Sequence, residues 1–211
     1  TVTLGNLAQT YDGLPKPVSV TTDPPGLAVA VTYDGSDTPP TEVGEYAVVA
    51  TVTDPNYLGS ASGTLVITMP DYGDWRQAQF DAAQLADGSA EWDADPDGDG
   101  VANLMEYGLD SDPNEAGQGP AGEVVEDAQG VARLTLAFIR PAGLPDIEYL
   151  VEVAGQLDAA EWTVVNEVEV TPLEGTDSER VVARDPVSAD DAGTERRFIR
   201  LRVRFKEGGG G

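Results

Sequence analysis

The sequence of 211 residues contains no cysteine and no histidine. Their absence excludes disulfide bonds, thiolate chemistry, zinc sites of the usual cysteine and histidine kind, and any nucleophile that a histidine would activate. Most hydrolase and redox mechanisms are therefore closed to this chain. A protein that works outside the cell without disulfides must be stabilised by packing or by a bound metal ion.

Basic residues are scarce as well, with 12 lysines and arginines against 38 aspartates and glutamates and a net charge of −26. This charge repels phosphate backbones and anionic lipids, so we expect neither nucleic-acid binding nor membrane insertion. No apolar run approaches the roughly 18 residues that span a bilayer. Because cations and salt relieve the self-repulsion of an acidic chain, we expect divalent ions or saline surroundings, with an ordinary acidic surface as the alternative.

Glycine and proline, by contrast, are plentiful, and their 24 and 15 residues separate short apolar runs. This pattern predicts many short strands joined by tight turns. In residues 1–70 the apolar positions alternate, which is the period of a strand with one buried face. We therefore expect a small antiparallel β-sandwich-like domain over 1–70. The clearest alternating sets are Leu27, Val29, Val31 and Tyr33, and Tyr46, Val48, Ala50 and Val52.

Two long segments of this first domain are similar in sequence to a known type of repeat. They read LAQTYDGLPKPVSVTTDPPGLAVAVTYDG from Leu7 and VGEYAVVATVTDPNYLGSASGTLVI from Val43. Over residues 2–68 the chain resembles the MBG-type repeat of bacterial surface adhesins, which serves as a stalk or spacer in large secreted proteins. The resemblance implies a structural or adhesive role, an extracellular or cell-surface location, and neighbouring domains of the same larger protein as partners. A surface glycan or another protein would be its ligand.

Residues 71–119 carry thirteen acidic residues and one arginine, and their apolar spacing becomes helical. We expect one helix capped by Asp74 and stopped near Gly88, and a second helix over 101–107. Since the segment is short, we expect it to be a connector between two β domains that a metal ion makes rigid.

The densest cluster of carboxylates lies between these helices, where DPDGDGVANLME begins at Asp95. The run matches the calcium-loop pattern D-x-[DN]-x-[DN]-G-x5-E at every specified position. Calcium prefers roughly six to eight oxygen ligands, and carboxylates held together without it repel one another. We therefore predict a Ca²⁺ site, with a solvated acidic turn as the alternative. Its expected ligands are Asp95, Asp97, Asp99, the carbonyl of Val101, Asn103 and Glu106.

No helix leads directly into this loop, so the loop resembles the loop-helix half of dockerins and thrombospondin type 3 repeats rather than a paired EF-hand. From Trp75 to Pro113, and in EYLVEVAGQLDAAEW and RRFIRLRV further on, the chain also resembles the calcium-loop module and C-terminal β domain of secreted proteins from Verrucomicrobia-like bacteria. A similar spacing begins at Asp110, Asp112 and Asn114 without a closing glutamate. A second ion and a capped turn both remain open there.

Residues 120–207 return to alternation and predict a second antiparallel β-sandwich-like domain, followed by a flexible glycine tail over 208–211. Seven of the ten arginines lie between Arg180 and Arg204. We expect Glu148 and Glu152 to pair with some of them across strands, with a ligand-binding role for these charges as the alternative.

The predicted fold is therefore mainly β, with two antiparallel β-sandwich-like domains joined by a helical calcium-loop module. We expect a non-enzymatic structural or adhesive part of a larger secreted or cell-surface bacterial protein. The alternative, a carbohydrate-binding appendage of a secreted enzyme, needs exposed aromatic rings. Its candidates are Trp92 and Trp162. We expect Trp92 instead to pack over the metal loop and Trp162 to lie in the core. A glycosidase with two catalytic carboxylates is a third reading, but the sequence singles out no pair.

Overall fold

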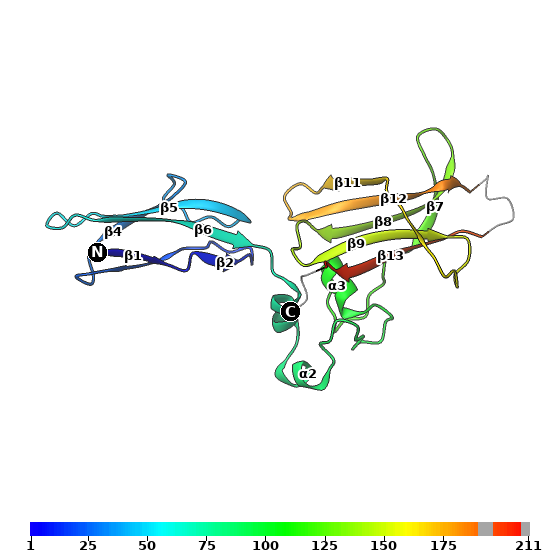
Figure 1. The fold of residues 1–211 in the computed structure, drawn as a ribbon, viewed down its shortest axis with the longest axis horizontal. Coiled ribbons are helices and arrows are strands. Elements are labelled where there is room, and N and C mark those ends of the chain that lie inside the picture. The colour runs from blue at the N-terminus through cyan, green and yellow to red at the C-terminus, as the bar shows by residue number, and fades with distance from the viewer. Residues whose placement is uncertain (190–195, 208–211) are drawn as a thin grey trace. The chain divides into compact units, whose positions relative to one another are not determined.

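The computed structural model describes residues 1–189 and 196–207. The described chain is mainly β, with mostly antiparallel sheets and a few short helices, as the sequence predicts. It divides into two compact units, Thr1–Pro70 and Asp71–Gly211 (Figure 1). The segment 71–119, expected as a separate connector, lies in the second unit together with 120–207. The glycine tail expected over 208–211 lies outside the described residues.

The first unit contains two sheets of short strands. One sheet pairs β1 with β3, and the other has the strand order β2, β6, β5, β4. All neighbours are antiparallel except β2 and β6, which are parallel. The strands are β1 (Val2–Gly5), β2 (Ala8–Thr10), β3 (Ser19–Thr22), β4 (Val29–Tyr33), β5 (Gly44–Val52) and β6 (Ser60–Thr68).

The predicted alternation accounts for the register of this unit. Val31 lies opposite Ala50 and Tyr33 lies opposite Val48, so the two apolar sets share one face of the sheet. The buried core that results contains Tyr33, Val48, Leu65 and Ile67. Sequence reasoning missed β2 because three residues of this composition form a strand only through their pairing with β6.

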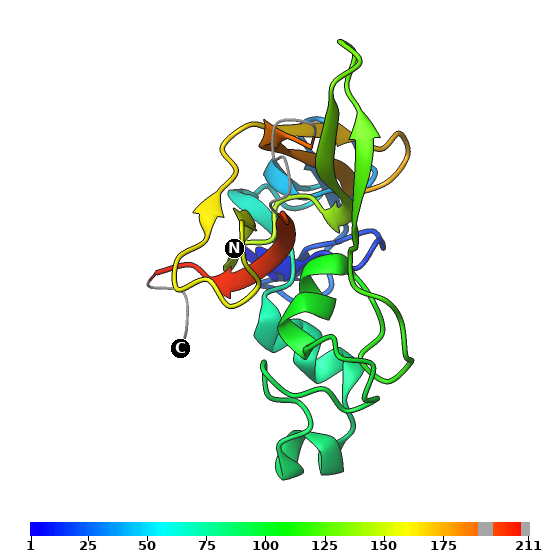
Figure 2. The ribbon, with the colours of Figure 1, turned by 90° about the vertical axis from the view of Figure 1, so that its right-hand side faces the viewer.

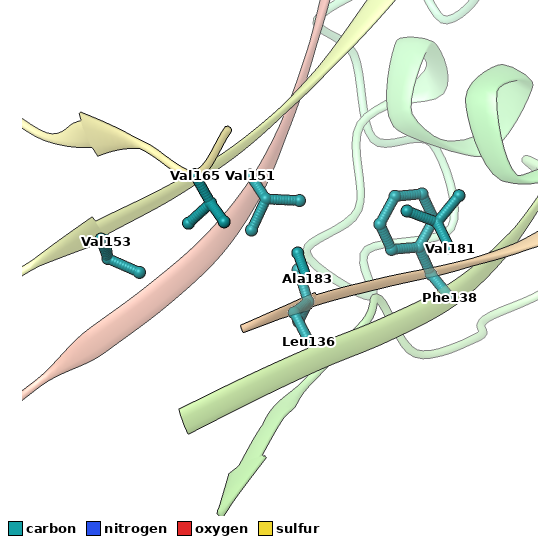
Figure 3. Packing of buried hydrophobic residues seen from close by; sticks show 7 residues of the cluster. All are labelled: Leu136, Phe138, Val151, Val153, Val165, Val181 and Ala183. Carbon is teal, nitrogen blue, oxygen red and sulfur yellow. The ribbon is translucent and has the colours of Figure 1, made fainter. Parts of the chain in front are cut away.

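The second unit contains a three-stranded sheet, in the order β10, β9, β13, and a four-stranded sheet, in the order β11, β12, β8, β7. The strands are β7 (Gly122–Glu126), β8 (Ala132–Pro141), β9 (Ile147–Ala154), β10 (Thr163–Val164), β11 (Val168–Pro172), β12 (Ser178–Ser188) and β13 (Phe198–Phe205). Figure 3 shows the core, in which Val151 and Val153 of β9 point toward Leu136 of β8 and Ala183 of β12. The two sheets therefore pack face to face as a sandwich.

Three short helices precede these strands. They are α1 (Tyr72–Gln79), α2 (Ala82–Asp87) and α3 (Asn103–Leu109). The single helix expected up to Gly88 is interrupted because Phe80 is extended and Asp81 starts a new helix with a reciprocal capping box. Asp71, rather than Asp74, caps α1, whereas Gly88 ends α2 in the left-handed conformation as predicted. None of the described helices is long and apolar enough to cross a membrane.

Helix α3 lies beside β8 and β13 of the second unit (Figure 2), and an aromatic cluster joins α1 and α3 to these sheets. The ring of Tyr72 lies 5.5 Å from Trp75, 5.6 Å from Tyr107 and 5.7 Å from Phe205 of β13, measured between centroids. Asp146 accepts hydrogen bonds of 2.7 Å from the backbone N–H of Tyr72 and from the hydroxyl of Tyr107. The helical segment is therefore anchored to the sandwich by both apolar and polar contacts.

Candidate metal centre

The acidic loop between α2 and α3 brings three of the predicted ligands together. One carboxylate oxygen from each of Asp95, Asp97 and Asp99 lies within 4.8 Å of the other two. The backbone N–H groups of Gly98 and Gly100 donate to the two oxygens of Asp95, each at 2.9 Å. Both glycines have positive φ, at 78° and 90°, which allows the tight turns. The backbone of the loop thus holds the carboxylates close despite their mutual repulsion.

Glu106 reaches the same region from α3 and is only 1% exposed. Its Oε1 atom accepts a long hydrogen bond of 3.4 Å from the hydroxyl of Ser111, and Oε2 has no hydrogen-bond partner among the described residues. Burial, followed by the charges of Asp97 and Asp99, raises the pKa of Glu106 to about 7. Glu106 stands outside the tight group of three aspartates, but with Asp99 it lines a cleft of about 300 Å³.

Asp97, like Glu106, has a buried carboxylate oxygen without a hydrogen-bond partner among the described residues. Its Oδ1 atom accepts the backbone N–H of Asp99 at 3.1 Å, while Oδ2 is buried without a hydrogen-bond partner in the described part of the chain. Burial raises the pKa of Asp97, and the charge of Asp99 adds to the shift. Burying a carboxylate oxygen without a hydrogen-bond partner lowers the stability of the folded protein. A set of hard oxygen donors in this state fits a divalent cation such as calcium.

Asn103 positions the loop through its side-chain amide. The residue is fully buried, and its Nδ2 atom donates to the carbonyls of Ser89 and Glu91 at 2.8 and 2.7 Å. Only Oδ1 remains without a hydrogen-bond partner among the described residues. The predicted ligand Asn103 therefore ties the incoming segment to the start of α3. The N–H of Val101, whose carbonyl is another predicted ligand, donates to Asp99 Oδ1 at 2.7 Å.

Two groups that support the centre were missed by sequence reasoning. The backbone N–H of Gly117 donates to Asp99 Oδ2 at 2.6 Å, and the hydroxyl of Ser111 donates to Glu106. Ser111 follows the left-handed end of α3 at Asp110, where φ is 56°. Neither residue stands in the loop pattern, so only the folded return of the chain brings them near it.

The second acidic run forms a capped turn. Asp112 Oδ1 accepts the backbone N–H of Asn114 at 2.9 Å. Both polar atoms of the Asn114 side chain form hydrogen bonds. Nδ2 donates to the carbonyl of Gln79 at 3.3 Å, and Oδ1 accepts from the side chain of Gln84 at 2.6 Å. These bonds tie the turn to α1 and α2. Of the two alternatives left open for Asp110, Asp112 and Asn114, the capped turn accounts for the geometry.

The two candidate carbohydrate-stacking residues differ in their surroundings. Trp92 is 50% exposed, packs edge-on against Phe205 at 6.4 Å between centroids, and lines a groove with Ala102, Leu104 and Met105 from the end of the acidic loop and the start of α3. Trp162 is only partly buried, and the guanidinium of Arg200 lies 4.0 Å from its ring centroid. One face of Trp162 is therefore covered by an arginine.

Comparison with known proteins concerns the first unit. A family model described as the MBG domain matches residues 1–70, while no curated protein and no solved structure matches the chain. The match confirms the MBG-type segment predicted from the sequence. MBG domains are a non-catalytic family of surface and secreted bacterial proteins, and the match indicates a structural or adhesion-type module of a larger protein. The resemblances found in residues 71–207 stay predictions.

Proposed function

We propose that the chain is a non-enzymatic, calcium-stabilised structural module of a larger secreted or cell-surface bacterial protein. The observation that carries the proposal is the buried Oε2 atom of Glu106, which has no hydrogen-bond partner among the described residues while the charges of Asp97 and Asp99 act on the same carboxylate. Oδ2 of Asp97 is likewise buried without a hydrogen-bond partner in the described part of the chain. A cation at this place would satisfy both oxygens and remove the repulsion between the carboxylates.

The proposed ligands are carboxylate oxygens of Asp95, Asp97, Asp99 and Glu106, together with the carbonyl of Val101. In this arrangement Asn103 fixes the backbone around the ion, and its Oδ1 atom is the remaining oxygen that could face a bound water. Calcium supplies charge neutralisation and cross-links the loop to α3, so its role is structural.

The packing of α3 predicts which part of the protein calcium stabilises. Glu106 is followed by Tyr107, whose hydroxyl binds Asp146, and by Gly108, whose carbonyl accepts the hydroxyl of Tyr149 at 2.7 Å. An ion that fixes Glu106 therefore fixes a helix already bound to the sandwich. We propose that calcium stabilises the whole of 71–207 rather than a free connector.

Calorimetric titration of chelator-treated protein with calcium tests the proposal. We expect one binding event, with a dissociation constant near 10⁻⁴ to 10⁻³ M, typical of extracellular modules, or tighter given the number of carboxylates. The paired substitutions Asp95→Asn and Asp97→Asn should abolish the heat. The matched pair Asp110→Asn and Asp112→Asn changes the charge equally in the second acidic turn and should leave the heat intact. No heat with the unmodified protein would refute the calcium site.

The alternative of a carbohydrate-binding appendage has less support. Stacking on sugars needs accessible aromatic faces, and one face of Trp162 is occupied by Arg200. Trp92 is the remaining candidate ring. Retention on a glycan panel that is lost in a Trp92→Ala variant would favour this alternative over a purely structural module.

A further inference from the structure

The strand β13 leaves one edge of its sheet open. It pairs with β9 and with no other strand in the described part of the chain. A groove of about 480 Å³ runs beside it, and residues from both faces of the strand line this groove. Exposed strand edges are templates for pairing with another strand. The groove is lined by Arg200, Leu201, Arg202 and Val203 of β13 and by Trp92, Asp93, Ala102, Leu104 and Met105.

The outer face of β13 carries a row of cations. Arg200, Arg202 and Arg204 have side chains that are 43%, 48% and 46% exposed. These three arginines share two carboxylates, because Arg200 and Arg202 both pair with Glu152 and Arg204 pairs with Glu148. In a chain with a net charge of −26 this row is a local exception. It favours an acidic partner.

The strand β11 has the complementary pattern on another open edge. It pairs only with β12 among the described strands, and the sequence from Glu167 to Val170 reads EVEV. Val168 and Val170 lie opposite core residues of β12, yet they are 39% and 43% exposed. Glu169 lies on the other face of the strand, where it pairs with Arg184 of β12 at 3.3 Å and keeps a side chain that is 62% exposed. The edge therefore presents acids on the outer face and valines on the inner face.

We propose that β11 of one copy of this chain pairs with β13 of a second copy. Glu169 of β11 and Glu167, which directly precedes the strand, stand two residues apart, as the arginines of β13 do, so their spacing of about 6.6 Å matches and the two glutamates meet the arginine row. On the inner face Val168 and Val170 then lie beside Leu201 and Val203. Because the two edges differ, the contact is heterologous and each copy keeps one edge for the next, which yields an open chain of molecules. This proposal rests on the strand edges and not on the calcium site.

Charge exchange between the two edges tests the proposal with the full chain, in calcium and about 0.15 M salt. One variant carries Arg202→Glu and Arg204→Glu, which leaves Arg200 stacked on Trp162. The other carries Glu167→Arg and Glu169→Arg. Sedimentation velocity over a concentration series should show association of the unmodified chain and a dissociation constant raised by at least about tenfold in either variant. An equimolar mixture of both variants should associate again, because each edge then meets an opposite charge.

Association in the mixture also shows that both variants are folded. A neutral variant with Arg202→Gln and Arg204→Gln should have a dissociation constant between those of the unmodified chain and the charge-exchanged variant. The matched control with Glu42→Arg and Glu45→Arg in the first unit should associate like the unmodified chain. Three results would overturn the proposal. They are an unmodified chain that stays monomeric, variants that associate as well as it does, and a mixture that remains monomeric.

Discussion

Glu106 combines three properties that rarely occur together at one carboxylate, namely near-complete burial, an oxygen without a partner and two neighbouring aspartates. Its replacement by glutamine keeps the shape and removes the charge. We expect the calcium-free protein to be at least as stable as the unmodified one near neutral pH, because a buried charge is lost. Calcium affinity should fall by at least about tenfold, or ~1.4 kcal/mol.

Thermal denaturation in chelator and in calcium measures both effects. The exposed Glu115, in the same acidic segment, provides the matched control, since Glu115→Gln should leave both melting temperatures nearly unchanged. If Glu106→Gln lowered the stability in chelator and in calcium by the same amount, Glu106 would have only a packing role.

The raised pKa of Glu106 predicts how stability and calcium binding depend on pH. The folded pKa of about 7 exceeds the usual value of 4.5, so the folded, calcium-free protein holds this proton more tightly than the unfolded chain. The contribution of this bound proton to the stability of the calcium-free fold is fully present below about pH 4.5 and is lost as the pH rises through 7. Since calcium requires the ionised carboxylate, its affinity should rise over the same range. Calcium titrations between about pH 5 and pH 8 should show this rise, and a flat profile would contradict it.

Helix α3 connects the acidic loop to the sandwich through the hydroxyl of Tyr107, which donates to Asp146 at 2.7 Å. A hydrogen bond to a charged group contributes about 1.5–3 kcal/mol, so Tyr107→Phe should lower the free energy of unfolding of the second unit by this amount. Chemical denaturation measures the change. Tyr57→Phe, at a half-exposed tyrosine of the first unit, serves as control and should have an effect within about 0.5 kcal/mol. Equal effects of both substitutions would show that the anchor is unimportant.

The elements that sequence predicted well are those with a local cause. Alternation in β4 and β5 predicted their shared face, and the close approach of Asp95, Asp97 and Asp99 follows from a pattern that lies within twelve consecutive residues. The pairing of Arg200 with Glu152 and of Arg204 with Glu148 was also expected, since both sets alternate on one face, and the structure confirms it.

The elements that sequence missed depend on contacts between distant segments. β7 reads GEVVE and is exposed throughout, so its strand form comes from pairing with β8 rather than from a buried face. The break before Asp81 was missed because the apolar spacing continues across it, although the capping box there is a local pattern that could have indicated it. The support from Gly117 and Asp146 could not be predicted, because neither residue lies in a recognisable motif.

For the whole molecule, the division after Pro70 predicts two unfolding transitions that respond differently to calcium. At free calcium of about 100 times the dissociation constant, the second unit should gain about 2.7 kcal/mol, while the first unit gains nothing. Scanning calorimetry of the full chain should therefore show one transition that moves on chelation and one that stays. The moving transition is assigned by its sensitivity to Tyr107→Phe. A pair of transitions that shift together would show that the ion acts on both units.

The parallel pairing of β2 with β6 has a mechanical consequence for the first unit. Ala8 lies beside Val66 and Thr10 beside Thr68, and the N–H of Tyr11 extends the ladder to the carbonyl of Thr68 at 2.8 Å. One strand lies near the start of the unit and the other at its end, and both run in the same direction. Tension applied between the two ends of the unit would therefore slide these strands lengthwise, and their hydrogen bonds would carry the load together instead of opening one after another. A segment connected in this way resists being pulled out along the direction in which a tether would be stretched.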